Sequence, residues 1–296
     1  MKRLVVSLVT VLFAFGNLIN AQETPSIFTH QVGIFKVSLL AEAQSQVKES
    51  LLIGATPEMK EQTNINGTYP NAMNAFLVQT SQQNILIDAG LGTNIFSNME
   101  SLGVSPEKID IILITHMHGD HIGGMLKNGE IAFPNAKVYI PQPEHDYWMS
   151  DKEMNKLPEN KQGGFLNARK VIESYAGNIQ LFQPGKLGDG TPIIPGFKGS
   201  AAYGHTPGHT IYLLESENDK FLVWGDVTHA MAIQMPYPQV ALTYDVDPDM
   251  AIESRKEVLE YVVKNKIPIA GMHIAYPSMG SIQKSQTSSY IFTPFQ

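Results

Sequence analysis

The chain has 296 residues, of which 43% are hydrophobic and 17% charged, a composition typical of one sizeable globular domain or two small, closely packed ones. Its 21 basic and 28 acidic residues give a formal net charge of −7, and no basic run offsets this balance, so nucleic acid and anionic membrane surfaces are disfavoured as partners. The absence of cysteine excludes disulfides, a lipid-modified amino terminus and thiolate metal ligands. Any metal site must therefore use histidine and carboxylate side chains.

The amino-terminal segment has the layout of a secretory signal peptide. It has a basic start, an apolar run over residues 4–19, and the small residue Ala21 before polar sequence. This predicts a signal peptide over 1–21, a single domain over 22–296, and export to the periplasm or the medium. The alternative is an uncleaved anchor, which needs about 17 apolar residues. Because glycine and asparagine interrupt the end of the run, we expect no stable membrane anchor.

Short apolar segments rich in β-branched and aromatic residues predict β-strands. In chain order they are residues 75–80, 84–90, 109–116, 136–141, 210–216, 220–226 and 268–273. A helix is predicted over 248–264, where a proline near the start is followed by apolar residues at helical spacing, with Asp247 as the expected N-cap. Strands and helices in both halves predict a layered α/β sandwich. The polar stretches 40–70 and 150–164 are interpreted as surface segments that could also act as lids.

The stretch HMHGDH places three histidines and one aspartate directly behind a predicted strand. His116 and His118 alternate on extended backbone, so their rings can point the same way. Asp120 and His121 follow at the turn and can face a second position. Zinc takes imidazole and carboxylate ligands, and catalytic zinc sites leave one coordination position for water. An isolated histidine would be interpreted as structural, but four ligand-type residues on one turn predict a site that can serve two metals.

Three further ligand-type residues stand at the ends of predicted strands or in the adjoining turns. They are His205 in GHTPGH, Asp226 in FLVWGD and His273 in PIAGMH. Strand ends on one rim of a sheet are where side chains distant in sequence can converge. We therefore expect these three residues to join the HMHGDH turn in one site.

These seven residues resemble the signature of the metallo-β-lactamase superfamily of hydrolases, H-x-H-x-D-H followed by a separate His, Asp and His. The resemblance implies a four-layered αββα sandwich with two zinc ions at one edge of the sheets. Carried over, the ligands of the first ion are His116, His118 and His205, those of the second are Asp120, His121 and His273, and the bridging residue is Asp226. A water shared by the ions would be ionised near neutral pH and attack as hydroxide. Manganese, cobalt or iron could replace zinc, because histidine and aspartate serve all of them.

The remaining histidines need separate interpretation. His209, the second histidine of GHTPGH, is interpreted as a structural group or as one that supports a ligand. His30 and His145 have no ligand context. His229 lies three residues after Asp226 and could reach the substrate, with a structural role as the alternative.

Asp226 narrows the resemblance within the superfamily. Dinuclear β-lactamases of this signature generally lack this aspartate. In having Asp226, the chain resembles N-acyl-homoserine lactonases and the secreted methyl parathion hydrolase group. It is also similar to the second group in the segments YGHTPGHT, WGDVTHAMAIQ and DVDPDMAIESRK. The second resemblance implies a substrate pocket lined by Phe96, Trp148 and Phe165, with burial in the core as the alternative for each. Better-known lactonases carry a tyrosine at the position of His229, whose neutral imidazole can donate the same hydrogen bond.

The leading hypothesis is an exported dizinc lactonase that opens N-acyl-homoserine lactones and so acts in quorum quenching. The resemblance implies attack by the bridging hydroxide, with Asp120 or His229 assisting proton transfer. The first alternative is an organophosphate or aryl-ester hydrolase with the same site, and the second is a non-catalytic metal-dependent scaffold. Nucleic-acid hydrolysis is disfavoured by charge and export. Glutathione thioester hydrolysis would need basic residues to bind the anionic thiol carrier, and the chain from Gly271 onward has only Lys284. The expected partner is a small lactone or ester, and a homodimer is left open.

Overall fold

The structure is a computed structural model that describes residues 26–286 and 289–296. The predicted signal peptide, residues 1–21, lies outside the described residues. In the described part of the chain, no helix has both the length and the apolar character needed to cross a membrane.

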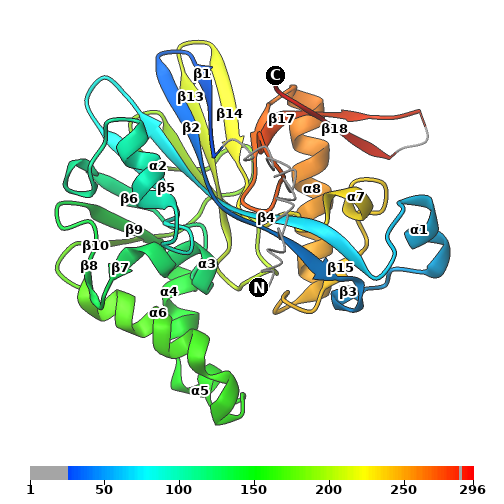
Figure 1. Cartoon of the computed structure of the whole chain (residues 1–296), viewed down its shortest axis with the longest axis horizontal. Helices are drawn as coiled ribbons and strands as arrows, with labels where there is room; N and C mark the ends of the chain where they lie inside the picture. Colours follow the sequence, from blue (N-terminus) through cyan, green and yellow to red (C-terminus); the bar gives the residue numbers. More distant parts are fainter. Residues whose placement is uncertain (1–25, 287–288) are drawn as a thin grey trace, which may run out of the picture.

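Two seven-stranded sheets form the centre of the molecule (Figure 1). The strands of the first sheet, in spatial order, are β1 (Ile27–Val32), β2 (Phe35–Lys48), β4 (Thr68–Gln79), β5 (Asn84–Ile87), β6 (Ile111–Leu113), β9 (Lys137–Pro141) and β10 (Ile179–Phe182). Those of the second are β11 (Thr191–Ile194), β12 (Phe197–Ala201), β13 (Thr210–Ser216), β14 (Asp219–Val223), β16 (Ile269–Ala270), β17 (Met279–Lys284) and β18 (Tyr290–Pro294). Two short pairs complete the strands: β3 (Leu52–Ile53) with β15 (Ala241–Leu242), and β7 (Leu126–Lys127) with β8 (Glu130–Ile131). Each predicted strand segment overlaps one of these strands.

Side chains that alternate along the strands produce the layers. On β5, Ile85 and Ile87 pack into the core between the two sheets, while Leu86 packs on the opposite face beneath helices. On β13, Leu214 belongs to the core between the sheets and Leu213 to the core on the outer side. Because successive strand residues point to opposite faces, continuous apolar strands such as these are buried on both sides.

Helices cover the outer face of each sheet, which gives four αββα layers and confirms the expected fold class (Figure 1). The first sheet is covered by α2 (Ile95–Ser101), α4 (Gln142–Met149) and α6 (Gly163–Ser174), and the second by α8 (Pro248–Asn265). The short helices are α1 (Pro57–Gln62), α3 (Gly119–Ile122), α5 (Asp151–Met154) and α7 (Met231–Gln234). The side chain of Asp247 accepts a hydrogen bond from the backbone N–H of Met250 at 3.0 Å. The predicted helix and its cap are therefore confirmed.

The polar stretch 40–70 is not a surface segment throughout, because its two ends belong to β2 and β4. Residues 43–48 alternate between half-buried and exposed positions, which explains their polar composition. The two strands extend beyond the main sheet as a long hairpin (Figure 1), and its Tyr69 packs in a separate core cluster with Ile233 and Leu242. This extension reaches the metal-ligand region described below. The stretch 150–164, in contrast, is mostly exposed.

Candidate metal centre

The HMHGDH turn follows β6, which lies between the parallel strands β5 and β9. The chain leaves the strand as extended backbone, and α3 begins at Gly119, so the first two histidines come from the loop and the next two ligand-type residues from the helix. Directly after α3, a Cβ on Gly124 would lie 2.2 Å from the carbonyl oxygen of Ala89. Glycine is therefore required for this turn to pack against the segment after β5.

Loops at the same sheet edge carry the other predicted ligands. His205 lies between β12 and β13, Asp226 follows β14, and His273 follows β16, which is parallel to β14. The structure brings all seven predicted residues together in two groups whose ligand atoms lie within 4.8 Å of one another. One group is His116, His118, His205 and Asp226, and the other is Asp120, His121 and His273.

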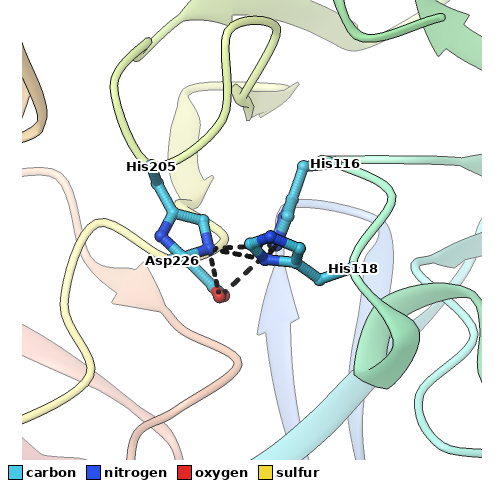
Figure 2. A group of neighbouring side chains, drawn as sticks. All are labelled: His116, His118, His205 and Asp226. Atoms are coloured by element: carbon cyan, nitrogen blue, oxygen red, sulfur yellow. Dashed lines mark hydrogen bonds and ion pairs between the residues drawn. The ribbon is translucent and has the colours of Figure 1, made fainter. Parts of the chain in front are cut away.

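The first group consists of three imidazole nitrogens and one carboxylate oxygen that face a common point (Figure 2). His118 Nδ1 lies 3.0 Å from His116 Nε2 and 2.9 Å from His205 Nε2. His205 Nε2 and His116 Nε2 are 3.2 Å apart. Oδ2 of Asp226 lies 3.2 Å from His205 Nε2 and 3.5 Å from His116 Nε2. Asp226 therefore supplies the carboxylate oxygen of this group.

Asp226 also contacts the second group. Its Oδ1 lies 3.2 Å from His121 Nε2, and its Oδ2 lies 3.0 Å from His273 Nε2. Oδ2 of Asp120 lies 3.5 Å from His273 Nε2 and 3.8 Å from His121 Nε2. One carboxylate thus borders both groups, which is the placement that a bridging ligand requires.

This donor set fits divalent cations. Two facing imidazole nitrogens can share at most one proton. The three nitrogens of the first group, which lie within 3.2 Å of one another, therefore cannot all form hydrogen bonds among themselves. A tetrahedral zinc ion with bonds of about 2.0–2.1 Å to nitrogen has ligand–ligand edges of about 3.3 Å, close to the spacings of the first group. The buried atoms His121 Nε2 and Asp226 Oδ1 lie 3.2 Å apart, yet they form no hydrogen bond with each other or with any other described residue, as expected for atoms that bind a metal.

The ligand-type histidines are of two kinds, those whose pKa is lowered and those whose pKa is raised. Burial and the adjacent His121 lower the pKa of His116 well below its ordinary value, and burial and His205 lower the pKa of His118 to about 3. Burial opposes protonation of His121 and His205 too, but the aspartates outweigh it, raising the pKa of His121 well above its ordinary value and that of His205 to about 9. Burial likewise opposes ionisation of Asp226, yet the surrounding histidines hold its pKa well below the usual range.

Outer hydrogen bonds orient the rings toward the centre. Nδ1 of His121 lies 2.7 Å from Oδ2 of Asp88, and Nδ1 of His205 lies 2.9 Å from Oδ1 of Asp245. Nδ1 of His273 faces the backbone carbonyl of Ala72 at 2.7 Å. Contacts of this kind fix the tautomer and leave Nε2 for the metal. Sequence reasoning missed both aspartates. Asp88 lies near the end of the predicted strand 84–90, in LIDAG, a strand-end signal like the one that identified Asp226.

A buried carboxylate, also missed by sequence reasoning, joins the two histidine-bearing loops. Oε1 of Glu144 accepts hydrogen bonds from Met117 N at 2.9 Å and from Trp148 Nε1 at 2.5 Å. Oε2 accepts from Thr206 Oγ1 at 2.6 Å and from Gly208 N at 3.0 Å. Burial raises the pKa of Glu144, while these four donors favour the ionised form. No sequence motif marks this residue, because its partners are distant in the chain.

Three of the other histidines lie outside the ligand groups. His209 faces the carbonyl of Ala202 through Nδ1 at 2.9 Å and accepts a hydrogen bond from the backbone N–H of Asp226 at Nε2, also at 2.9 Å. It therefore supports a predicted ligand. His30, on β1, stacks on a phenylalanine ring at a centroid distance of 4.2 Å, and His145 faces its neighbouring aspartate on α4.

His229 lies at the centre itself. Its Nε2 is 3.0 Å from Oδ2 of Asp226, and its ring stacks on that of His273 with centroids 4.4 Å apart. With Asp226 and His273 it forms a third group able to hold a metal. Burial and His273 lower the pKa of His229 to about 4, so its imidazole is neutral at pH 7.

A cavity of about 330 Å³ opens onto the ligand groups. This volume is at the lower end of the range for small-molecule sites. The lining residues are Val47, Asn71, Met73, His118, Gly119, Asp120, His205, Asp226, His229, Tyr244 and His273. The long β2–β4 hairpin thus supplies the first three, and the loops at the sheet edge supply the rest.

The predicted aromatic wall of the pocket needs correction, because Phe96, Trp148 and Phe165 do not line this cavity. Trp148 and Phe165 are buried in the core beneath α4 and α6, and only the edge-on contact of Trp148 with the His118 ring brings one of them near the centre. Phe96 packs on Phe133 away from the cavity. The alternative interpretation, burial in the core, describes Trp148 and Phe165.

Two relatives differ in how much of this chain they match. An N-acyl homoserine lactonase of Bacillus cereus is 25% identical over 260 residues, which cover 74% of this chain and 90% of the lactonase. Exodeoxyribonuclease WalJ of Streptococcus pneumoniae is 47% identical over 111 residues, which cover 34% of this chain. This chain spans only 40% of the length of that nuclease.

Solved structures agree with the layered fold. The structure of hydrolase AbOPH in the beta lactamase superfamily has a TM-score of 0.82 and 29% identity, covering 93% of this chain and 99% of that one. The structure of AidC, a dizinc quorum-quenching lactonase, has a TM-score of 0.80 and 24% identity, covering 92% and 98%. The family described as Lactamase_B, metallo-beta-lactamase superfamily, matches residues 68–270, more than half of the chain. This chain therefore belongs to the metallo-beta-lactamase superfamily of metal-dependent hydrolases.

Proposed function

We propose that this chain is an exported dinuclear zinc lactonase that opens N-acyl-homoserine lactones. The observation that carries the proposal is the position of Asp226, whose two carboxylate oxygens contact both ligand groups. One ion would be held by His116, His118 and His205, the other by Asp120, His121 and His273, with Asp226 shared. When bound, such ions supply Lewis acidity and lower the pKa of water toward neutrality.

Two residues beside the ligands are placed to handle the substrate and its protons. Asp120 lines the cavity, and its side chain is a quarter exposed, so it can exchange a proton with a molecule bound there. The neutral ring of His229 offers one N–H donor and one acceptor nitrogen. We assign His229 to hydrogen-bond the lactone carbonyl. Burial opposes ionisation of Asp120, but the neighbouring histidines lower its pKa, so this ionised carboxylate would accept the proton of the attacking water and pass it to the departing ring alkoxide.

The cavity and the relatives support a small ester with an apolar tail. Val47 and Met73 are apolar residues among those that line the cavity, and a flexible methionine adapts to an alkyl chain. The Bacillus cereus relative that aligns with most of this chain is an N-acyl homoserine lactonase. An organophosphate or aryl ester is the alternative substrate, since the same groups could serve attack at phosphorus or at an activated carbonyl.

A substrate panel on zinc-reconstituted protein tests this proposal. The panel contains N-hexanoyl-homoserine lactone, an aryl lactone, an aryl ester, a phosphotriester and single-stranded DNA. We expect kcat/KM for the acyl-homoserine lactone to exceed that for each other substrate by at least about tenfold, a difference of about 1.4 kcal/mol in transition-state stabilisation. A rate near background with this lactone, beside rapid turnover of another member, would refute the proposal.

A further inference from the structure

Thr115 contacts the ring nitrogen of His116 that does not face the other ligand-type residues. Nε2 of His116 faces the first ligand group (Figure 2), and its Nδ1 lies 3.1 Å from Oγ1 of Thr115. His121, His205 and His273 instead have a carboxylate or a backbone carbonyl at Nδ1. A hydroxyl can donate or accept, so the role of Thr115 depends on where its own proton goes.

The protons of this network have one consistent arrangement when His116 and His121 each bind an ion through Nε2. A ligating imidazole is neutral, so its one proton is then on Nδ1. Nδ1–H of His121 donates to Oδ2 of Asp88 at 2.7 Å, and Nδ1–H of His116 donates to Oγ1 of Thr115. The Thr115 hydroxyl therefore donates its own proton to the same Oδ2, which lies 2.6 Å away.

Asp88 is placed to accept all the hydrogen bonds that this arrangement requires. Its side chain is fully buried, and its second oxygen, Oδ1, accepts the backbone N–H of Thr115 at 2.7 Å. An ionised carboxylate offers about four lone-pair sites and no donor, which suits three donors. Burial raises the pKa of Asp88, while these donors favour the ionised form. Asp88 thus contacts one ligand group through His121 and is one hydroxyl away from the other.

We propose that Thr115 is a positioning residue through which Asp88 orients a ligand of each metal ion. One buried carboxylate fixes His121 of the second group directly and His116 of the first group through the Thr115 hydroxyl. This inference rests on the dinuclear centre of the proposed function. The affinities for both ions then depend on Asp88, whereas Thr115 affects only the ion bound by His116.

Variants at Thr115 can separate its hydroxyl from its backbone. The main chain is held without the hydroxyl, because its N–H donates to Asp88 and its carbonyl accepts a hydrogen bond from the backbone N–H of Thr210 at 3.0 Å. Thr115→Val removes the hydroxyl and keeps the branched shape, whereas Thr115→Ser keeps the hydroxyl. In Asp88→Asn, one oxygen can still accept the Thr115 N–H, but the NH₂ group cannot accept from the hydroxyl or from His121.

Competition with a chromophoric chelator, which gives a dissociation constant for each of the two zinc ions, tests the inference. Loss of a group that supports a ligand typically lowers metal affinity by about 10–100-fold. We therefore expect Thr115→Val to raise one of the two dissociation constants by this factor, and Thr115→Ser to retain the wild-type values. Asp88→Asn should raise both constants.

The outcomes separate the inference from the proposed function. Wild-type protein that binds only one zinc ion overturns the dinuclear centre and this inference together. If the wild type binds two, the role of Thr115 is overturned, and the centre left standing, by unchanged constants in Thr115→Val, by equal changes in both constants, or by an equal loss in Thr115→Ser. An Asp88→Asn variant that weakens the binding of only one ion overturns the shared carboxylate.

Proton NMR of the imidazole N–H groups decides if Asp88→Asn does not fold. In zinc-loaded Thr115→Val, His121 is the one side-chain donor left at Oδ2 of Asp88 among the described residues. Its hydrogen bond should therefore strengthen, and its ring N–H resonance should move downfield from the wild-type position. A resonance that stays in place overturns the shared carboxylate. Thr115→Ala, which also lacks the hydroxyl, replaces Thr115→Val if the valine variant does not fold.

Discussion

The backbone N–H of Asp226 donates a hydrogen bond to Nε2 of His209 at 2.9 Å. His209 is buried, and burial together with His205 lowers its pKa to about 3, so the ring is neutral and Nε2 can accept. Its Nδ1 faces the carbonyl of Ala202 at 2.9 Å. An imidazole on the loop after β12 thus holds the backbone of the residue that carries the shared carboxylate.

Replacing His209 by alanine should weaken zinc binding without removing a ligand. Loss of a group that supports a ligand typically lowers metal affinity by about 10–100-fold, and the orphaned N–H of Asp226 adds a stability cost of about 1–3 kcal/mol. Competition with a chromophoric chelator measures the affinity. His145→Ala, a change at a partly exposed position outside the ligand groups, is the matched control. Unchanged affinity in His209→Ala would show that the loop holds Asp226 without this imidazole.

Glu144→Gln should destabilise the fold around both histidine loops. Glutamine replaces one acceptor oxygen by an NH₂ group, so a backbone N–H of Met117 or Gly208 loses its partner. We expect the free energy of unfolding to fall by about 1–3 kcal/mol, measured by denaturant titration of the metal-free protein. Glu159→Gln, at an exposed position, should change it by less than about 0.5 kcal/mol. An equal, small change in both variants would contradict the bridging role of Glu144.

Zinc binding should release protons at pH 7. Burial opposes protonation of His121, His205 and His273, but the aspartates raise the pKa of all three rings. The shift is large enough for the rings of His121 and His205 to hold protons at pH 7 in the metal-free protein. A ligating imidazole must be neutral. As the pH rises through about 9, His205 loses its proton in the metal-free protein, so it should no longer add to the protons that zinc binding releases. Calorimetric titration in buffers of different ionisation enthalpy counts the released protons, and a binding enthalpy independent of the buffer would contradict this prediction.

Much of the fold and the ligand set could be predicted from the sequence because both depend on local patterns. Apolar strands ending in polar residues placed His205, Asp226 and His273 at the sheet edge, where the structure brings them together with the HMHGDH turn. The αββα layers were implied by the family resemblance and are confirmed. The helix at Asp247 was predicted from its own cap and spacing.

Residues whose role depends on tertiary contacts could not be predicted in the same way. Glu144 is identified only by partners in two distant loops. Phe165 was assigned to the pocket by resemblance, but its position on α6 directs it into the core. The pocket wall came instead from the β2–β4 hairpin, part of which had been interpreted as a polar surface segment.

The zinc content of the wild type and Asp226→Ala tests the central claim most directly. Both proteins are saturated with zinc, freed of excess metal by gel filtration and measured by elemental analysis. The wild type should retain two zinc ions per chain. Asp226→Ala should retain at most one, because both ligand groups lose the carboxylate that they share. Two ions retained by the variant, or only one by the wild type, would contradict a dinuclear centre bridged by Asp226.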